Sequence, residues 1–215
     1  MNKINYITAE YYVSCTKQQI VHKLWSVINK YQTRGFNITA IHGDNEFNVN
    51  GIKDSVLPTL THIYGKEEHV GVIERTIRTT KERCRCICHK VPYRFYTRLM
   101  VEGLIAVAIK WLNAFPSKGS ISDKMSPAMI IEVKPNPDMN KRHITFGPYV
   151  MLFIGTDNSM RRRSVLAIAL NESNDHGGYY FMNLYTGKQL LTTGKSGHNI
   201  THTYYVNLLH IVLLP

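Results

Sequence analysis

Acidic residues are scarce in this 215-residue chain. There are 15 Asp and Glu against 26 Lys and Arg, which gives a formal charge of +11 at pH 7, and residues 1–43 contain no Asp. A charge of this sign favours a polyanion such as nucleic acid over an acidic small molecule as the partner. Long apolar runs are also missing, because the late run YYVNLLHIVLLP is well short of the ~20 residues that a membrane-spanning helix needs.

Cysteine is rare, and three of the four cysteines, Cys84, Cys86 and Cys88, lie within five residues of one another. Near neighbours on a helix do not have disulfide geometry, so we expect reduced thiols in an intracellular setting. A zinc site usually adds a second, distant ligand pair, and without one the prediction is ordinary core or surface thiols. The start, MNKINYITAEYY, has no apolar segment typical of a secretion signal, so secretion is not expected.

The first 130 residues alternate strand-like and helix-like patterns, which predicts an α/β domain. β-branched and aromatic runs indicate strands, and apolar residues at three- and four-residue steps indicate helices. Thr16 is the expected N-cap of the first helix. The predicted elements are strands at 4–13, 36–42 and 60–64, helices at 17–35, 68–90 and 93–115, and a short helix or turn at 49–60.

Composition changes after Phe115. Residues 116–148 carry five of the eight prolines, which indicates a linker with a short helix at MSPAMIIEV. Three apolar stretches separated by polar turns follow, namely YVMLFIG, SVLAIAL and GYYFMNLY. They predict a small β-barrel or sheet.

The helix predicted at 68–90 has a buried row and a charged row side by side. The row expected to be buried consists of Val70, Ile73, Ile77, Thr80, Cys84 and Ile87. The neighbouring row consists of Glu74, Arg78, Lys81 and Arg85, with Arg75 beside it. Such a cationic row suits a phosphate backbone. From spacing alone, a Glu four residues before an Arg is usually an i,i+4 ion-pair partner, here of Arg78.

Asp44 follows a predicted strand in a Gly-Asp-Asn turn. Catalytic groups gather at strand ends in open α/β sheets, and a carboxylate there together with Glu74 would suit Mg²⁺ and in-line phosphoryl transfer. The alternative is simple turn chemistry, for which Asp is well suited.

Four separated segments resemble, in order, the integrase of copia-type LTR retrotransposons. They are IHGDNEF, HVGVIERTIRTTKERCRC, WLNAFPSKGSISDKMSP and PNPDMNKRHITFGPYVMLF, and the resemblance covers about residues 1–190. It implies a ribonuclease H-like α/β integrase core with an incomplete first strand, followed by a small all-β, barrel-like domain. The implied divisions are 1–130 (core), 131–148 (linker), 149–192 (barrel) and 193–215 (divergent tail).

The resemblance also implies DNA integration by a DDE metal triad that uses Mg²⁺ or Mn²⁺. Asp44 matches the second triad carboxylate, in a DNxEF-like motif, and Glu74 matches the third, in a G-x-x-E-R motif. The implied partners are element ends and target DNA, with no membrane, and the protein would be a homo-oligomer in the nucleus or a cytoplasmic particle. The residues expected to bind DNA are Arg75, Arg78, Lys81 and Arg85.

The first triad Asp has no counterpart in residues 1–43, and Glu10 does not match its position. We therefore expect a truncated or degenerate copy whose incomplete metal site leaves it inactive by itself. The competing hypothesis is a non-catalytic, basic nucleic-acid-binding module that retains the scaffold. Residues 161–163, all Arg, are consistent with either phosphate contacts or a solvated loop, whereas Trp25 and Trp111 are expected to pack in the core.

Overall fold

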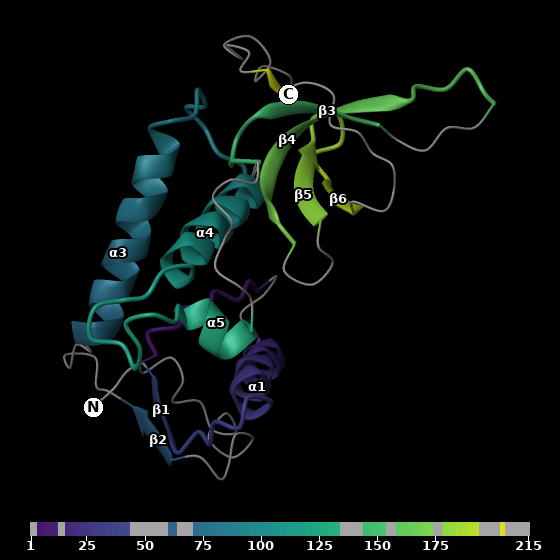
Figure 1. Ribbon diagram of the computed structural model, residues 1–215. Coiled ribbons are helices and arrows are strands. Elements are labelled where there is room, and N and C mark those ends of the chain that lie inside the picture. Colours follow the sequence, from purple (N-terminus) through teal and green to yellow (C-terminus); the bar gives the residue numbers. More distant parts are fainter. Residues whose placement is uncertain are drawn as a thin grey trace. The chain divides into compact units, whose positions relative to one another are not determined.

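The structure is a computed structural model that describes residues 4–12, 16–43, 60–63, 71–133, 144–153, 158–173, 178–193 and 203–204. Figure 1 shows the elements in chain order: α1 (Lys17–Gln32), β1 (Ala40–Gly43), β2 (Leu60–Ile63), α3 (Gly71–Cys88), α4 (Arg98–Asn113), α5 (Pro127–Glu132), β3 (Tyr149–Phe153), β4 (Ser164–Glu172), β5 (Gly178–Asn183), β6 (Gln189–Thr193) and β7 (Thr203–Tyr204). The predicted short helix or turn at 49–60 falls almost entirely outside the described residues.

The chain divides into two compact units, each made of two separate stretches. The first unit comprises Met1–Thr79 and Trp111–Pro137, and the second comprises Thr80–Lys110 and Asp138–Pro215. The helices α3 and α4 therefore each contribute residues to both units. The domain boundaries that the sequence predicts at residues 130, 148 and 192 stay predictions.

In the first unit, α1 packs its apolar face against the chain that follows it. Ile28 is buried, and Leu24, Trp25 and Ile41 pack against it. The chain turns after the helix at Gly35, whose φ of +79° is accessible to a residue without Cβ. The predicted helix and the packing role of Trp25 are thus confirmed.

β1 and β2 form a parallel pair in which Ala40 lies opposite Leu60 and Gly43 lies opposite Ile63. The strands predicted at 36–42 and 60–64 are therefore confirmed, although the first begins only at Ala40. In a parallel pair both carboxyl ends lie at the same edge. Asp44 is the next residue along the chain after β1.

The strand predicted at residues 4–13 is wrong for residues 4–12, which form no strand. Asn5 has a φ of +55°, which interrupts an extended run. The backbone of Ile7 pairs instead with the buried side chain of Asn113: Ile7 N donates to Oδ1 at 2.9 Å, and Nδ2 donates to Ile7 O at 2.6 Å. One carboxamide thus supplies the acceptor and donor that a neighbouring strand would have provided.

α5 is the short helix predicted at MSPAMIIEV. Its N-cap, Ser126, accepts a hydrogen bond from Met129 N at 3.3 Å, and Pro127 occupies the first turn, where a missing N–H costs nothing. The helix lies beside α1 (Figure 1), and Arg34 Nε donates to Ile131 O at 2.9 Å.

In the second unit, α4 packs on one face of the sheet. Met100 and Leu104 form a buried cluster with Ile168, Leu170 and Met182. All five side chains are at least 94% buried, since their exposed fractions are 6% or less. This cluster is the main hydrophobic core that the structure describes in the second unit.

α4 is shorter than the helix predicted at 93–115. Its first turn is capped by Thr97, whose Oγ1 accepts the N–H of Met100 at 3.3 Å, so the helix begins at Arg98. Gly103 brings the helix close to β4, because a Cβ at this position would lie 2.9 Å from the Cβ of Leu170. The apolar helix is confirmed, although it begins later and ends earlier than predicted.

The five strands of the second unit form one antiparallel sheet in the order β6-β5-β4-β3-β7. A bulge between Ala169 and Asn171 interrupts the β4–β5 ladder, a feature that bends and twists a strand. The face away from the first cluster buries Val150, Leu152, Ala167, Ala169 and Phe181.

Both faces of this sheet are therefore packed, and its strong curvature is visible in Figure 1. The three predicted strands are confirmed, whereas β6 and β7 had no prediction. The described strands pair in an open order, so closure into a barrel stays a prediction. The mixed α/β class is confirmed, and the ribonuclease H-like identity of the core stays a prediction.

Candidate nucleic-acid interface

The charged row of α3 faces solvent along its whole length. Glu74, Arg78, Lys81 and Arg85 follow one another at four-, three- and four-residue steps, and all four are exposed, as is Arg75 beside them. With Arg83 and Glu82 included, α3 carries five cationic and two acidic side chains, a balance of +3. The sequence-predicted row thus exists as a continuous, net positive surface of one helix.

The buried row predicted for α3 is only half right. Cys84, Ile87 and Cys88 pack against the core of the second unit. Ile77 and Ile73, about two and three turns before Cys84, are 48% and 41% exposed. The apolar periodicity is present in both halves, but only the C-terminal half has an apolar cluster among the described residues to pack against.

Glu74 lies in the first turn of α3. A carboxylate in a first turn interacts favourably with the positive end of the helix dipole and with the unsatisfied N–H groups there. This position gives Glu74 a helix-stabilising role that holds whether or not it also binds a metal.

Among the described cations of the row, Arg85 is held in an ion pair. Its guanidinium forms an ion pair with Glu82, three residues earlier on the same helix. Both side chains are more than half exposed, so the pair is screened by water and contributes little to stability. Arg75, Arg78 and Lys81 are therefore better suited than Arg85 to contact phosphates.

Asp44 lies outside the described residues, so its distance from Glu74 is not part of the structure. Within the described part of the chain, no group of three or more His, Cys, Asp or Glu side chains gathers as metal ligands do. The described donors thus do not by themselves form a Mg²⁺ site. The assignment of Mg²⁺ or Mn²⁺ to Asp44 and Glu74 stays a prediction from the resemblance.

Glu10 is engaged by two lysines of α1. Its carboxylate oxygens lie 3.1 Å from Lys23 Nζ and 3.6 Å from Lys30 Nζ, and its side chain is 20% exposed. This ion-paired arrangement ties residues 4–12 to α1. This ion pairing gives Glu10 a structural role.

The clustered thiols behave as core and surface groups. Cys84 and Cys88 are partly buried against the hydrophobic cluster of the second unit, while Cys86 is exposed, and all three are unpaired thiols. Burial, with a smaller contribution from Cys88, raises the pKa of the Cys84 thiol. A raised pKa leaves less of the nucleophilic, metal-binding thiolate. The prediction of ordinary thiols is confirmed for these three cysteines.

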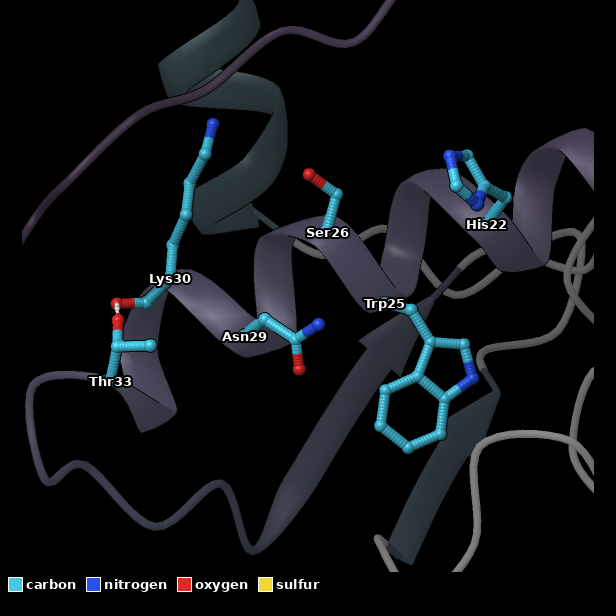
Figure 2. A pocket seen from close by; sticks show the side chains of 6 residues that line it. All are labelled: His22, Trp25, Ser26, Asn29, Lys30 and Thr33. Atoms are coloured by element: carbon cyan, nitrogen blue, oxygen red, sulfur yellow. Dashed lines mark hydrogen bonds between the residues drawn. The ribbon is translucent and has the colours of Figure 1, made fainter. Parts of the chain in front are cut away.

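A shallow hollow of about 450 Å³ runs along α1. Its lining side chains are His22, Trp25, Ser26, Asn29, Lys30 and Thr33. Figure 2 shows His22, Ser26 and Lys30 projecting to one side of the helix and Trp25 to the other, so they do not converge on one point. The polar tip of Lys30 is already held near Glu10. The hollow therefore does not have the geometry of a catalytic site.

Arg162 and Tyr185 form an exposed contact that the sequence did not predict. The Arg162 guanidinium carbon lies 5.5 Å from the centroid of the Tyr185 ring, which is 62% exposed. Arg162 belongs to the triple-arginine stretch, which is visible in the sequence. Only the fold brings Tyr185, 23 residues later, next to it.

No protein-family model matches the chain. No curated protein matches it either. Among solved structures, it is similar to a chain in "CryoEM structure of simian T-cell lymphotropic virus intasome in complex with PP2A regulatory subunit B56 gamma", at 15% identity and a TM-score of 0.40, over 88% of this chain and 68% of that chain. A likeness at this level supports no conclusion about function. In the described part of the chain, no helix is long and apolar enough to span a membrane.

Proposed function

We propose that this chain is an integrase-like DNA-binding protein that contacts the phosphates of duplex DNA through Arg75, Arg78 and Lys81 of α3, with Arg85 at the end of the row. The observation that carries the proposal is the exposure of all four cations on one helix with a net positive balance. The motif resemblance described above supports the integrase-like assignment.

The dimensions of the row fit a DNA strand. From Arg78 to Arg85 an α-helix rises about 10 Å, at ~1.5 Å per residue. Duplex DNA presents a phosphate about every 3.4 Å of axis on each strand, so the row spans about three phosphates. Phosphate contacts require positive charge and reach rather than a pocket, and the open α3 surface provides both.

The finer proposal is that Asp44 and Glu74 are the remnants of a Mg²⁺-dependent phosphoryl-transfer site. A bound Mg²⁺ pair would activate the attacking oxygen and stabilise the leaving one. Only two of the three family carboxylates have matches in this chain, so we expect no strand transfer or end processing from it alone. Mg²⁺-dependent joining of element ends that Glu74→Ala abolishes would contradict this expectation.

A titration of duplex DNA against the full chain at several salt concentrations tests the binding proposal. The expected result is an affinity that falls steeply and log-linearly with salt, because bound phosphates release their counterions. Repeating the titration with and without Mg²⁺ separates the two hypotheses. Affinity that does not respond to Mg²⁺ beyond its ionic strength favours the non-catalytic module, whereas a specific Mg²⁺ requirement favours a retained metal site. No measurable binding at low salt would refute both.

A further inference from the structure

A second cationic surface lies at one end of the sheet in the second unit. It is formed by the turn between β5 and β6 and the segment before β4, and we call it the sheet-end patch: Arg161, Arg162, Arg163, Tyr185 and Lys188. All five residues are exposed. Among the described residues of these two segments, 158–163 and 184–188, there are four cations and no acidic residue.

The aromatic ring of the patch is displayed on a rigid turn. Asn183 Oδ1 accepts hydrogen bonds from Tyr185 N at 2.8 Å and Thr186 N at 3.2 Å, and Asn183 N donates to Lys188 O at 2.9 Å. Gly187 closes the turn with a φ of +64°. The Tyr185 backbone is thus fixed before any partner arrives, which reduces the entropy lost on binding.

Only part of the Tyr185 ring is covered by the chain itself. Arg162 lies over the ring in a cation–π contact, yet 62% of Tyr185 stays exposed. A planar, exposed ring with one guanidinium over it and further exposed cations on the same two segments suits an unpaired base that stacks while its phosphate is neutralised. Duplex DNA gains little from such a ring, because its bases already stack within the helix.

We propose that the sheet-end patch binds single-stranded nucleic acid, with one unpaired base stacked on Tyr185 and the adjacent phosphates contacted by Arg161, Arg163 and Lys188. This goes beyond the proposed function, which concerns duplex phosphates on α3. It also uses other elements of the chain, the segment before β4 and the turn after β5, and a different form of the ligand, so either proposal can fail while the other holds.

Fluorescence anisotropy of the full chain with labelled oligothymidylate and with a labelled duplex tests the proposal. Tyr185→Leu should weaken oligothymidylate binding about 5- to 150-fold, the range for loss of one stacked base, and leave duplex binding within twofold. Tyr185→Phe should bind oligothymidylate as the wild type does, because the ring is kept. Phe95→Leu is the matched control, since Phe95 is another exposed aromatic residue, at 79%, outside the patch.

Three results would overturn the proposal. The first is wild-type protein that does not bind oligothymidylate at low salt. The second is Tyr185→Leu that binds it as tightly as the wild type. The third is Tyr185→Leu that weakens both ligands equally, or Phe95→Leu that weakens oligothymidylate binding as much as Tyr185→Leu does, since either result indicates a general effect on the protein. A loss of duplex binding in α3 variants, with oligothymidylate binding intact, would bear only on the proposed function.

Discussion

The side chain of Asn113 forms hydrogen bonds to the backbone of residues 4–12 that a neighbouring strand would normally form. Its exposed fraction is 4%, and its carboxamide bonds both polar backbone groups of Ile7. Asn113→Ala should therefore lower the free energy of unfolding by about 1–3 kcal/mol, because it removes the partners of two backbone groups. Chemical denaturation measures the change.

Asn29→Ala is the control for this substitution, because Asn29 is an exposed residue of α1. It should change the unfolding free energy by less than about 0.5 kcal/mol. Equal effects of the two substitutions would show that Asn113 has no special bracing role.

Tyr179 makes the free energy of unfolding depend on pH in the alkaline range. Burial, followed by the nearby Glu172 carboxylate, raises the pKa of Tyr179 from 10.0 to about 12, and the hydroxyl donates to Glu172 Oε1 at 3.0 Å. The folded protein therefore keeps this proton at a pH where the unfolded chain has lost it. Its contribution to stability is complete below about pH 10 and declines as the pH rises toward 12.

Tyr179→Phe removes this proton, so the variant should lose less stability between pH 10 and 12 than the wild type does. Urea unfolding at a series of pH values gives the comparison. Other tyrosines with raised pKa values, such as Tyr31 and Tyr149, affect both proteins alike. Identical pH slopes for the two proteins would contradict the account.

At the scale of elements, α3 is a helix whose two halves have different roles. Ile87 packs against the core of the second unit, whereas Ile77 is 48% exposed. Ile87→Ala should lower the free energy of unfolding by about 1–2 kcal/mol, less than the same substitution of a fully buried Ile would. Ile77→Ala should change the free energy of unfolding by less than about 0.5 kcal/mol. The higher helix propensity of Ala offsets part of any loss. Thermal or urea unfolding of the pair tests the assignment, and equal losses would contradict it.

Periodicity predicted most elements because it reports how residues recur along one segment. The 3.6-residue pattern located α1, α3 and α4, and the β-branched runs located β1 to β5. It failed where a residue distant in the sequence determines whether a segment forms a strand or packs in the core. Residues 4–12 have strand composition, but Asn113 replaces the neighbouring strand, and Ile77 has core spacing without an apolar partner in the described residues.

The sequence likewise predicted a candidate site only where its residues belong to one segment. The charged row of α3 was predictable because all its residues share one helix. The patch around Tyr185 was not, because Arg162 and Tyr185 meet only when β4 and β5 pair. The relation between Asp44 and Glu74 stays a prediction, because Asp44 lies outside the described residues.

At the scale of the whole molecule, the two units are interleaved along the sequence. The sheet of the second unit depends on Met100 and Leu104 of α4, which precede it by more than 40 residues. A fragment of residues 138–215 should therefore expose Ile168, Leu170 and Met182 and fail to unfold cooperatively. Circular dichroism during urea titration checks this, and a cooperative transition in the fragment would contradict it.

The salt dependence of DNA binding by Arg78→Gln/Lys81→Gln tests most directly whether α3 binds duplex DNA through its exposed cations. The control is Lys118→Gln/Lys124→Gln, which removes the same charge from exposed positions outside α3. If both α3 cations contact phosphates, the slope of log affinity against log salt should become shallower by about 1.8, at ~0.9 per contact, while the control keeps the wild-type slope. Equal slopes for the α3 variant and the control would contradict the account.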